Sequence, residues 1–298
     1  MDIITVSGGR PGIAAKIMDK PVTLLVDTGG ASSMVFRSVV RELNLPVSQA
    51  QFEIVTVAGQ RSRDQVRLPS ITLGTLRQEG AYFMIAPNDV PSENRSFDGI
   101  IAPDFLSRVD ADFDFGVKRL NLVSPDHCAG KVVYWSAPAS APALAVVSFH
   151  IDRNGHISFP VRLDGRRVDA ILDTGAYNTT LNLNIARRTF DVDTNAPDIQ
   201  KVGQVEGGYK ADIFRKQFKT LAIEGVTVNN PMIDLLPDLV SAPGSTPKPT
   251  GSLIRESDTD LPGIILGMNV LSRLHVYVAY KEAKLYITAA NPPAGPSP

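Results

Sequence analysis

Hydrophobic and polar residues alternate in two similar series along the chain. Apolar runs typical of β-strands occur at residues 22–26 and 168–172, and an earlier apolar segment precedes each, at 13–18 and 157–163. A tight turn separates the two segments of each series, and the second turn, Asp164-Gly165, is a strong hairpin signal. The pattern predicts a β-hairpin in each half of the chain.

Each hairpin is followed by a short segment with helical spacing. In the first half, apolar residues recur at helical intervals from Val39 to Leu45, and Pro46 ends the segment. In the second half, residues 183–190 show the same spacing. Because helices are few, whereas 23 Gly and 22 Pro indicate many turns, the sequence predicts an all-β protein with short helices.

The two halves of the chain repeat each other. Asp27-Thr28-Gly29 recurs 146 residues later as Asp173-Thr174-Gly175, and both triplets directly follow the apolar runs described above. Residues 100–109 resemble residues 265–274, a spacing of 165. The second spacing is longer than the first, so the second half contains extra residues. Residues 241–251, rich in Pro, Gly, Ser and Thr, are predicted to be this insertion and to be exposed. We therefore expect two β-rich lobes related by a pseudo-twofold axis.

Segments of low complexity indicate the boundaries of these lobes. Residues 136–145 combine alternating proline with small residues, which predicts a semi-rigid linker. The N-terminal lobe is then 1–135 and the C-terminal lobe is 146–290. The tail, 291–298, contains four prolines and is expected to be disordered.

Overall charge and hydropathy argue against several classes of partner. The 30 Lys and Arg residues nearly balance the 31 Asp and Glu residues, so nucleic acid is not an expected partner. No run approaches the roughly 18 apolar residues of a membrane span, and no integral membrane segment is expected. The N-terminus shows no leader pattern. Localisation stays open: periplasmic or exported if a signal peptide has been removed, otherwise cytoplasmic, and soluble in either case.

No metal or cofactor is expected from the sequence. A single cysteine, Cys128, excludes an internal disulfide and any site built from several cysteines. The four histidines show no ligand spacing and are interpreted as surface or structural residues: His127, His150, His156 and His275.

The repeated triplet offers a chemistry that a single copy would not. Two carboxylates about 3 Å apart cannot both ionise, so they share one proton. The ionised member can activate a water, and the protonated member can donate to a carbonyl oxygen. A twofold axis would bring Asp27 and Asp173 together in this way. We expect Thr28 and Thr174 to hydrogen-bond across the axis. Gly29 and Gly175 should let backbone N–H groups come close to the carboxylates, an approach that a side chain would block.

At this point the chain resembles the aspartic proteases of the pepsin and retropepsin superfamily. The likeness is carried by residues 24–32 and 170–176 around the two triplets, and by Ile265-Leu266-Gly267 and Ile100-Ile101-Ala102, where Ala102 replaces the usual glycine. It implies a two-lobed aspartic protease fold with barrel-like lobes. It also implies peptide or protein substrates, and catalysis by Asp27 and Asp173.

The same family covers its active site with a β-hairpin flap. The candidate in the first half is 52–65, with its tip at Ala58, Gly59 and Gln60. The equivalent region of the second half contains Gly208 and Tyr209, which we expect to contact substrate as well. Pepsin-like flaps carry a tyrosine in the first lobe, and none occurs within 52–65. Either the second hairpin, with Tyr209, also closes on substrate, or the first flap works without a tyrosine.

The leading hypothesis is thus an aspartic endopeptidase that works as a monomer, because both half-sites lie in one chain. The alternative is a catalytically silent peptide-binding module on the same scaffold. A processing protease with one dedicated substrate would show the same sequence features as the first. Pepsin-like relatives commonly place Ser or Thr after each triplet, whereas this chain has Gly30 and Ala176. Without those hydroxyl donors, we expect an activity optimum less acidic than that of a pepsin-type gastric enzyme, at mildly acidic or near-neutral pH.

Overall fold

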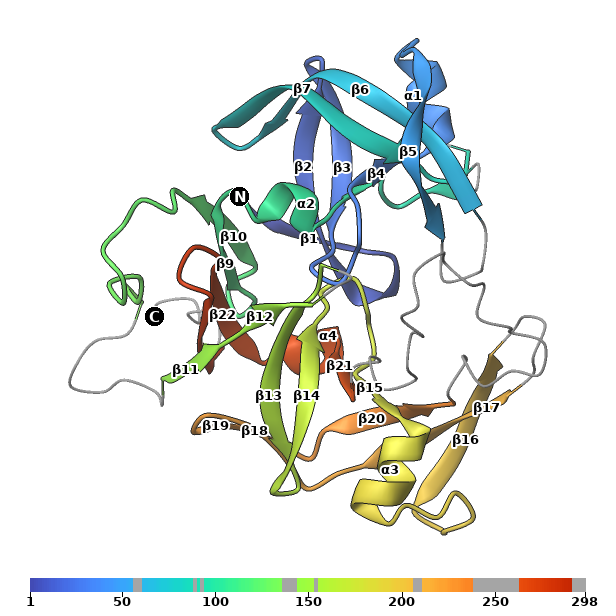
Figure 1. The fold of residues 1–298 in the computed structure, drawn as a ribbon, viewed down its shortest axis with the longest axis vertical. Helices are drawn as coiled ribbons and strands as arrows, with labels where there is room; N and C mark the ends of the chain where they lie inside the picture. The colour runs from blue at the N-terminus through green and yellow to red at the C-terminus, as the bar shows by residue number, and fades with distance from the viewer. Residues whose placement is uncertain are drawn as a thin grey trace, which may run out of the picture.

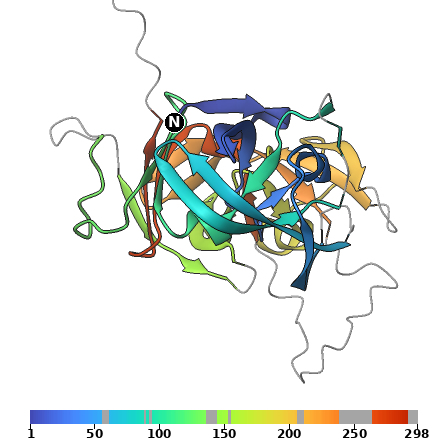
Figure 2. The ribbon, with the colours of Figure 1, turned by 90° about the horizontal axis from the view of Figure 1, so that it is seen from above.

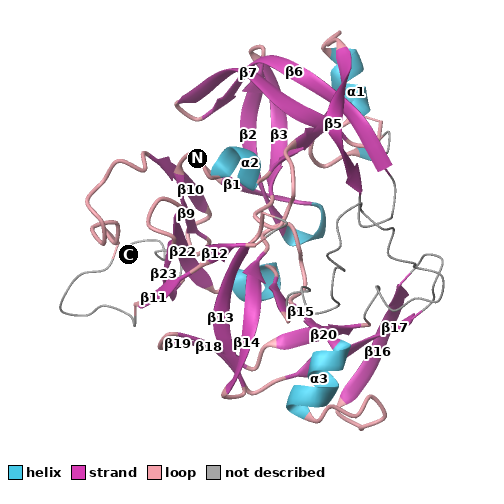
Figure 3. Cartoon of the chain, viewed as in Figure 1, coloured by secondary structure: helices cyan, strands magenta, loops and turns pink. Residues whose placement is uncertain are grey.

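In this computed structural model, the chain is described at residues 1–55, 61–87, 90–91, 94–135, 144–152, 155–205, 211–237 and 263–290. Strands dominate and the helices are short (Figure 3). The two halves form separate lobes, one above the other, with a third group of strands beside them (Figure 1). The fold class is therefore all-β and two-lobed, as the sequence predicts.

The first lobe is an eight-stranded sheet in the order β1-β2-β3-β8-β4-β7-β6-β5. Alternating burial along β2 and β6 places one side of each strand in the core. The strands are β1 (Ile3–Val6), β2 (Arg10–Ile17), β3 (Lys20–Val26), β4 (Met34–Val35), β5 (Val47–Val55), β6 (Arg61–Leu73), β7 (Leu76–Ile85) and β8 (Gly99–Ile101).

The second lobe is a ten-stranded sheet in the order β16-β17-β20-β15-β21-β14-β13-β18-β19, with β12 paired to β13. Its strands are β12 (His150–Ile151), β13 (Ile157–Leu163), β14 (Arg166–Leu172), β15 (Thr180–Asn182), β16 (Ile199–Val205), β17 (Ala211–Gln217), β18 (Thr220–Ile223), β19 (Val226–Asn229), β20 (Met232–Leu236) and β21 (Ile264–Leu266).

The centre of each lobe has the same topology. In the first lobe, β3 pairs in parallel with β8, and β4 pairs antiparallel with the other side of β8. In the second lobe, β14 pairs in parallel with β21, and β15 pairs antiparallel with β21. The repeat expected from the sequence is thus present in the strand pairing. Each Asp-Thr-Gly triplet directly follows a central strand, β3 or β14, whose last residues are buried.

Four α-helices and one 3₁₀ turn complete the described elements. They are η1 (Ser7–Gly9), α1 (Arg37–Glu42), α2 (Pro103–Leu106), α3 (Leu183–Phe190) and α4 (Met268–Leu271). Helix α3 begins where the Asn182 side chain accepts hydrogen bonds from the amides of Asn184 and Ile185, and ends at Asp191 in the left-handed region.

A five-stranded sheet contains strands from both halves, in the order β10-β9-β22-β23-β11. Its central contact is antiparallel pairing of β9 with β22, for example Phe113 with Val276. From above, these strands lie along one side of the molecule (Figure 2). The bounds are β9 (Asp110–Asp114), β10 (Arg119–Val123), β11 (Ala145–Ser148), β22 (Leu274–Ala279) and β23 (Lys284–Ala289).

We call residues 124–135 the strap, because they cross the outer face of this shared sheet. Every residue of β22 is buried, one side against the main core and the other beneath the strap. Trp135 stacks on His275 with ring centroids 4.0 Å apart, and its indole nitrogen donates to Thr288. The strap thus leads the chain from β10, at one edge of the shared sheet, towards β11 at the other.

The strap also covers two carboxylates that are fully buried, Asp110 and Asp112. His127 Nε2 lies 2.5 Å from Asp110 Oδ2, and Tyr134 donates to Asp112. Burial alone would raise the pKa of Asp112, but its hydrogen bonds from His275, Tyr134 and Asn121 outweigh that effect and lower the pKa. Each buried acid is therefore paired rather than isolated.

Several expected segments lie outside the described residues. They are the two flap tips, most of the linker at 136–143, the insertion at 241–251 and the tail at 291–298. The arms of the first flap are present, since β5 and β6 pair up to Val55 and Arg61. The arms of the equivalent hairpin, β16 and β17, pair up to Val205 and Ala211.

Candidate active site

The two Asp-Thr-Gly turns begin where β3 and β14 end. The Asp27 amide donates to the carbonyl of Ile101 at 2.9 Å, and the Asp173 amide donates to the carbonyl of Leu266 at 3.1 Å. Each turn is therefore attached by its first residue to the neighbouring parallel strand. Since the attachments are equivalent, the two aspartates emerge at equivalent positions of the two lobes.

The threonines join the turns across the pseudo-twofold axis. Thr28 Oγ1 donates to the Leu172 carbonyl at 2.8 Å, and Thr174 Oγ1 donates to the Val26 carbonyl at 2.6 Å. Each hydroxyl also accepts from the amide of the other threonine, both at 3.1 Å. Both side chains are buried. These four reciprocal bonds are the cross-axis contacts expected from the sequence, and they fix the turns against each other.

The glycines provide the space in which the carboxylates lie. A Cβ atom on Gly29 would lie 2.3 Å from Cγ of Asp173, and one on Gly175 would lie 2.4 Å from Cγ of Asp27. Real Cβ atoms do not approach other atoms so closely. Each glycine therefore makes room for the aspartate of the opposite lobe, in addition to donating its amide to the carboxylate of its own.

The two carboxyl groups hydrogen-bond to each other and hold their protons to unusually high pH. Burial, followed by the charge of Asp173, raises the pKa of Asp27 to about 7. Burial also raises the pKa of Asp173, although the amides of Ala176 and Gly175 oppose the effect. One shared proton is therefore retained over a wide range of pH.

Hydroxyl side chains behind the turns hold them in place. The Ala102 amide donates to Ser33 Oγ at 3.0 Å, and the Gly267 amide donates to Thr179 Oγ1 at 3.0 Å. The amide of Ser33 in turn donates to the Asp104 carboxylate. In the second lobe, the amide of Thr179 donates to Asn269. The two lobes thus use one scheme, with a carboxylate in the first lobe where the second has an amide.

The substitution of Ala102 for the usual glycine is accommodated by Gly30. A Cβ atom on Gly30 would lie 3.3 Å from Cβ of Ala102 and 3.1 Å from Oδ2 of Asp27. In the second lobe the small residue is Gly267, whose Cβ would lie 2.6 Å from the backbone of Asn178. Close packing behind the first turn is therefore maintained, because position 30, rather than position 102, has no side chain.

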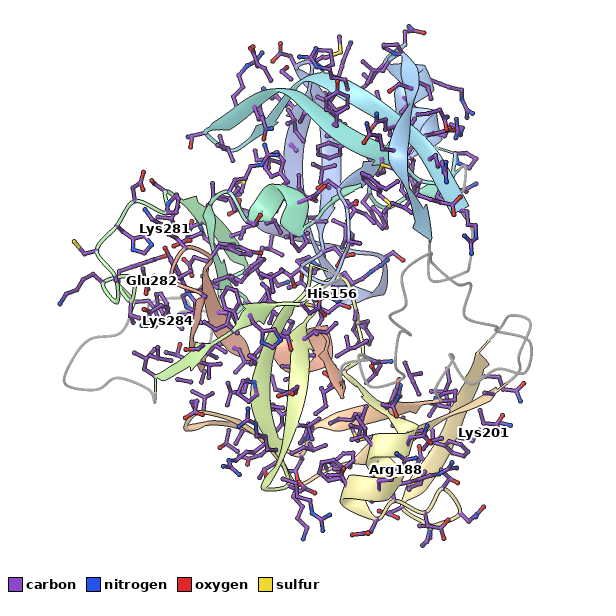
Figure 4. All side chains as sticks on the ribbon, viewed as in Figure 1. His156, Arg188, Lys201, Lys281, Glu282 and Lys284 are labelled. Atoms are coloured by element: carbon purple, nitrogen blue, oxygen red, sulfur yellow. The ribbon has the colours of Figure 1, made fainter. Side chains whose placement is uncertain are left out.

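His156, which the sequence pattern indicates only as a surface or structural histidine, lies between the lobes just before β13 (Figure 4). Its charge lowers the pKa of Asp173. A signal for this position was present in the sequence, because His156 precedes Asp173 by the same 17 residues that separate Arg10 from Asp27. Both positions of the repeat carry a basic residue.

The two lobes also touch through Tyr177, another residue the sequence analysis did not select. A Cβ atom on Gly9 would lie 2.8 Å from the ring of Tyr177, so the N-terminal turn of the first lobe packs on this side chain. The ring remains half-exposed. Its equivalent in the first lobe is Ala31, and the repeat is therefore unequal immediately beside the two aspartates.

The flap residues selected from the sequence are Ala58, Gly59, Gln60, Gly208 and Tyr209, and all five lie outside the described residues. Their contact with substrate stays a prediction. Among the residues that the structure describes, no group of three or more His, Cys, Asp or Glu side chains could hold a metal ion. Within the same residues, no helix is long and apolar enough to cross a membrane.

Comparison with known proteins identifies a family. The family model described as aspartyl protease matches residues 13–105 and 159–270, which together make up more than half of the chain. None of the curated proteins matches it. Among solved structures, a retropepsin-like aspartic protease from Rickettsia conorii is similar, with 14% identity and a TM-score of 0.35 over 50% of this chain and 94% of that one. From the family match, the chain belongs to the aspartyl protease family.

Proposed function

We propose that this protein is an aspartic endopeptidase in which Asp27 and Asp173 together activate one water molecule. The observation that carries the proposal is the hydrogen-bonded pair of carboxyls, held by four reciprocal threonine bonds. A misplacement of about 1 Å at such a pair costs roughly 100-fold in rate, so the rigid mounting favours a catalytic role. The proposed lobes are 1–135 and 146–290, joined by 136–145.

In the proposed reaction the ionised carboxylate takes a proton from water while the water oxygen attacks the scissile carbonyl carbon. The protonated carboxyl gives its proton to the carbonyl oxygen, and a tetrahedral diol forms. The carboxyl that took the water proton then gives it to the amide nitrogen. As the C–N bond breaks, the diol returns a proton to the other carboxylate. The pair again holds one proton.

The test is a diverse peptide library incubated across a range of pH with wild type, Asp27→Asn and Asp173→Asn. Each variant should lose nearly all activity, and the double variant should lose little more, because one carboxyl cannot perform both proton transfers. Asp169→Asn is the matched control, since Asp169 is exposed on β14, four residues before Asp173. It should retain wild-type cleavage.

Two readouts separate this function from the alternative of a silent peptide-binding module. Cleavage in ¹⁸O-labelled water should place the label in the new carboxyl group, because water attacks directly. A statine-type inhibitor should bind wild type through the hydroxyl that replaces the attacking water. Peptide binding without cleavage by wild type would favour the silent module. Cleavage by either single Asn variant would contradict the assignment of the pair.

A further inference from the structure

Each lobe has a row of side chains that crosses its sheet from the aspartate strand to an arm of the flap hairpin. Residues directly opposite each other in a β-sheet point to the same side, so a row can be followed from one pair to the next. The strand pairing gives two equivalent rows. The first row is Leu25, Ile100, Met34, Met84 and Gln65, and the second row is Ile171, Ile265, Thr180, Asp234 and Arg215.

Both rows lie on the side of the sheet from which the aspartates project. Leu25 precedes Asp27 by two residues, and Ile171 precedes Asp173 by two, and residues two apart on a strand share a side. The strand neighbours of Leu25 and Ile171 belong to the main hydrophobic core, whereas Leu25 and Ile171 do not. The second and third members of each row are partly exposed. A peptide whose scissile bond lies between the aspartates would therefore meet one row on each side of that bond.

The first row is apolar where it approaches the flap hairpin. Met34 and Met84 form a small hydrophobic cluster with Ala50 and Ile54 of β5, separate from the main core. Methionine side chains are flexible and polarisable, so they adapt to apolar partners of different shape. This surface suits an apolar side chain of the substrate.

The second row is polar at the same positions. Thr180 stands where the first row has Met34, and buried Asp234 stands where it has Met84. Arg215 binds Asp234 in a two-point ion pair, from Nε to Oδ1 at 2.6 Å and from Nη2 to Oδ2 at 3.0 Å. Asn178 donates to the same carboxylate at 2.8 Å. Because Asn178 follows Asp173 by five residues, this network is attached to the aspartate turn itself.

The ion pair leaves part of the guanidinium able to bind a ligand. The Arg215 side chain is 33% exposed, and within the described residues its Nη1 has no hydrogen-bond acceptor. An apolar side chain placed against it would displace water from these N–H donors without replacing the hydrogen bonds, which is unfavourable. A side chain that ends in an amide or carboxylate oxygen would accept from Nη1 instead.

Building on the proposed function, we propose that the two rows select a substrate of unequal polarity. The peptide has an apolar side chain on the first-row side of the scissile bond and an amide-bearing or carboxylate-bearing side chain on the second-row side. Arg215 is the residue that determines the second preference. The pseudo-symmetric scaffold thus recognises a substrate that is not symmetric about the bond to be cut.

The experiment compares peptides with methionine or glutamine at matching positions on the two sides of the scissile bond, since these side chains have nearly the same length. Of the four combinations, one mixed peptide should have the highest kcat/KM. The Met/Met and Gln/Gln peptides should each be about 10-fold poorer or worse. Glutamate in place of the preferred glutamine distinguishes a carboxylate from an amide as the acceptor, and retention of the preference with either supports the proposal.

The triple variant Thr180→Met/Asp234→Met/Arg215→Gln gives the second row the residues of the first. It should prefer methionine on both sides of the scissile bond, with the first-row preference unchanged. Lys216→Met is the matched control. Lys216 is also ion-paired, with Asp198, but it is the next residue on β17 and points to the opposite side of the sheet. This control should keep the wild-type preferences.

Equal cleavage of the four peptides, or fastest cleavage of the Met/Met peptide, would overturn the inference while leaving the peptidase in place. Wild type alone decides this, even if the triple variant does not fold. If no peptide is cleaved, the proposed function fails instead. Binding of the same peptides to Asp27→Asn, measured by fluorescence anisotropy, then tests the preference without cleavage: tighter binding of one mixed peptide would support it, and equal binding of all four would overturn it.

Discussion

At the residue scale, the threonines of the two triplets contribute position rather than chemistry. Thr28 is fully buried, and its hydroxyl both donates to Leu172 and accepts from Thr174. Thr28→Val keeps the shape but leaves two buried backbone groups without partners, at a cost of about 1–3 kcal/mol each. Urea unfolding should show this loss, and kcat/KM should fall about 100-fold as the turns shift. Thr28→Ser keeps both bonds, so near-wild-type values are expected. Unchanged kcat/KM in Thr28→Val would contradict the positioning role.

We expect burial of the aspartates and the residue after each triplet together to determine the working pH. The pKa of Asp27, raised to about 7 chiefly by burial, places the alkaline limb of the kcat/KM profile near neutral pH. Ala176→Ser adds a hydroxyl beside Asp173, and donation to the carboxylate favours its ionised form. The pKa of the pair therefore falls, and the profile should move to lower pH. A pH series of kcat/KM checks this, and a wild-type optimum near pH 2–3 would contradict it.

At the element scale, the strap over the shared sheet makes stability depend on pH. The hydrogen bond to buried Asp110 raises the pKa of His127 above its ordinary value of about 6.5. A raised pKa in the folded state adds stability that is fully present below about pH 6.5 and is lost as the pH rises through the raised value. His127→Gln should thus lose about 1–2 kcal/mol at pH 5.5 and less at pH 9.

Urea unfolding at the two pH values measures this difference. His150→Gln, at an exposed histidine of β12, is the control and should change stability little at either pH. An equal loss in His127→Gln at both pH values would show that packing, rather than the charge, accounts for the contribution of His127.

The elements that the sequence predicts well are those whose signals are local. In the second half of the chain, the first strand of the hairpin occupies residues 157–163 and the helix occupies residues 183–190, as predicted. The first helix instead ends at Glu42, before Pro46, because Asn44 turns the chain in the left-handed region at φ +50°. The spacing of apolar residues alone does not predict that turn.

The shared sheet could not be predicted in the same way. The segment at 110–114 alternates Asp with apolar residues, which normally indicates a strand with one face in solvent. That face is buried only because the strap covers it, and the partner strand β22 is remote in sequence. The electrostatic effect of His156 on Asp173 likewise arises only when the chain is folded, because 17 residues separate the two in sequence. Both features depend on contacts between segments that are distant in sequence, so the periodicity of hydrophobic residues cannot predict them.

At the scale of the whole molecule, one chain contains both halves of the candidate active site. Both aspartate turns and both halves of the β9–β22 contact belong to it. We therefore expect a monomer, because no second copy is needed to complete the pair. Sedimentation across a dilution series, with specific activity measured on the same samples, checks this. An obligate dimer whose activity falls on dilution would contradict it.

The pairing of β9 with β22 sets an order of events during synthesis. Strand β9 ends at Asp114 and β22 begins at Leu274, so about 160 residues must be added before the partner of β9 exists. At roughly 5–20 residues per second, the ribosome needs on the order of 10–30 s to add them. During that interval the nascent first half has an unpaired strand edge, and by the internal repeat its natural substitute is the same edge of a neighbouring nascent chain. We therefore expect closely spaced ribosomes on one message to lower the yield of correctly folded protein.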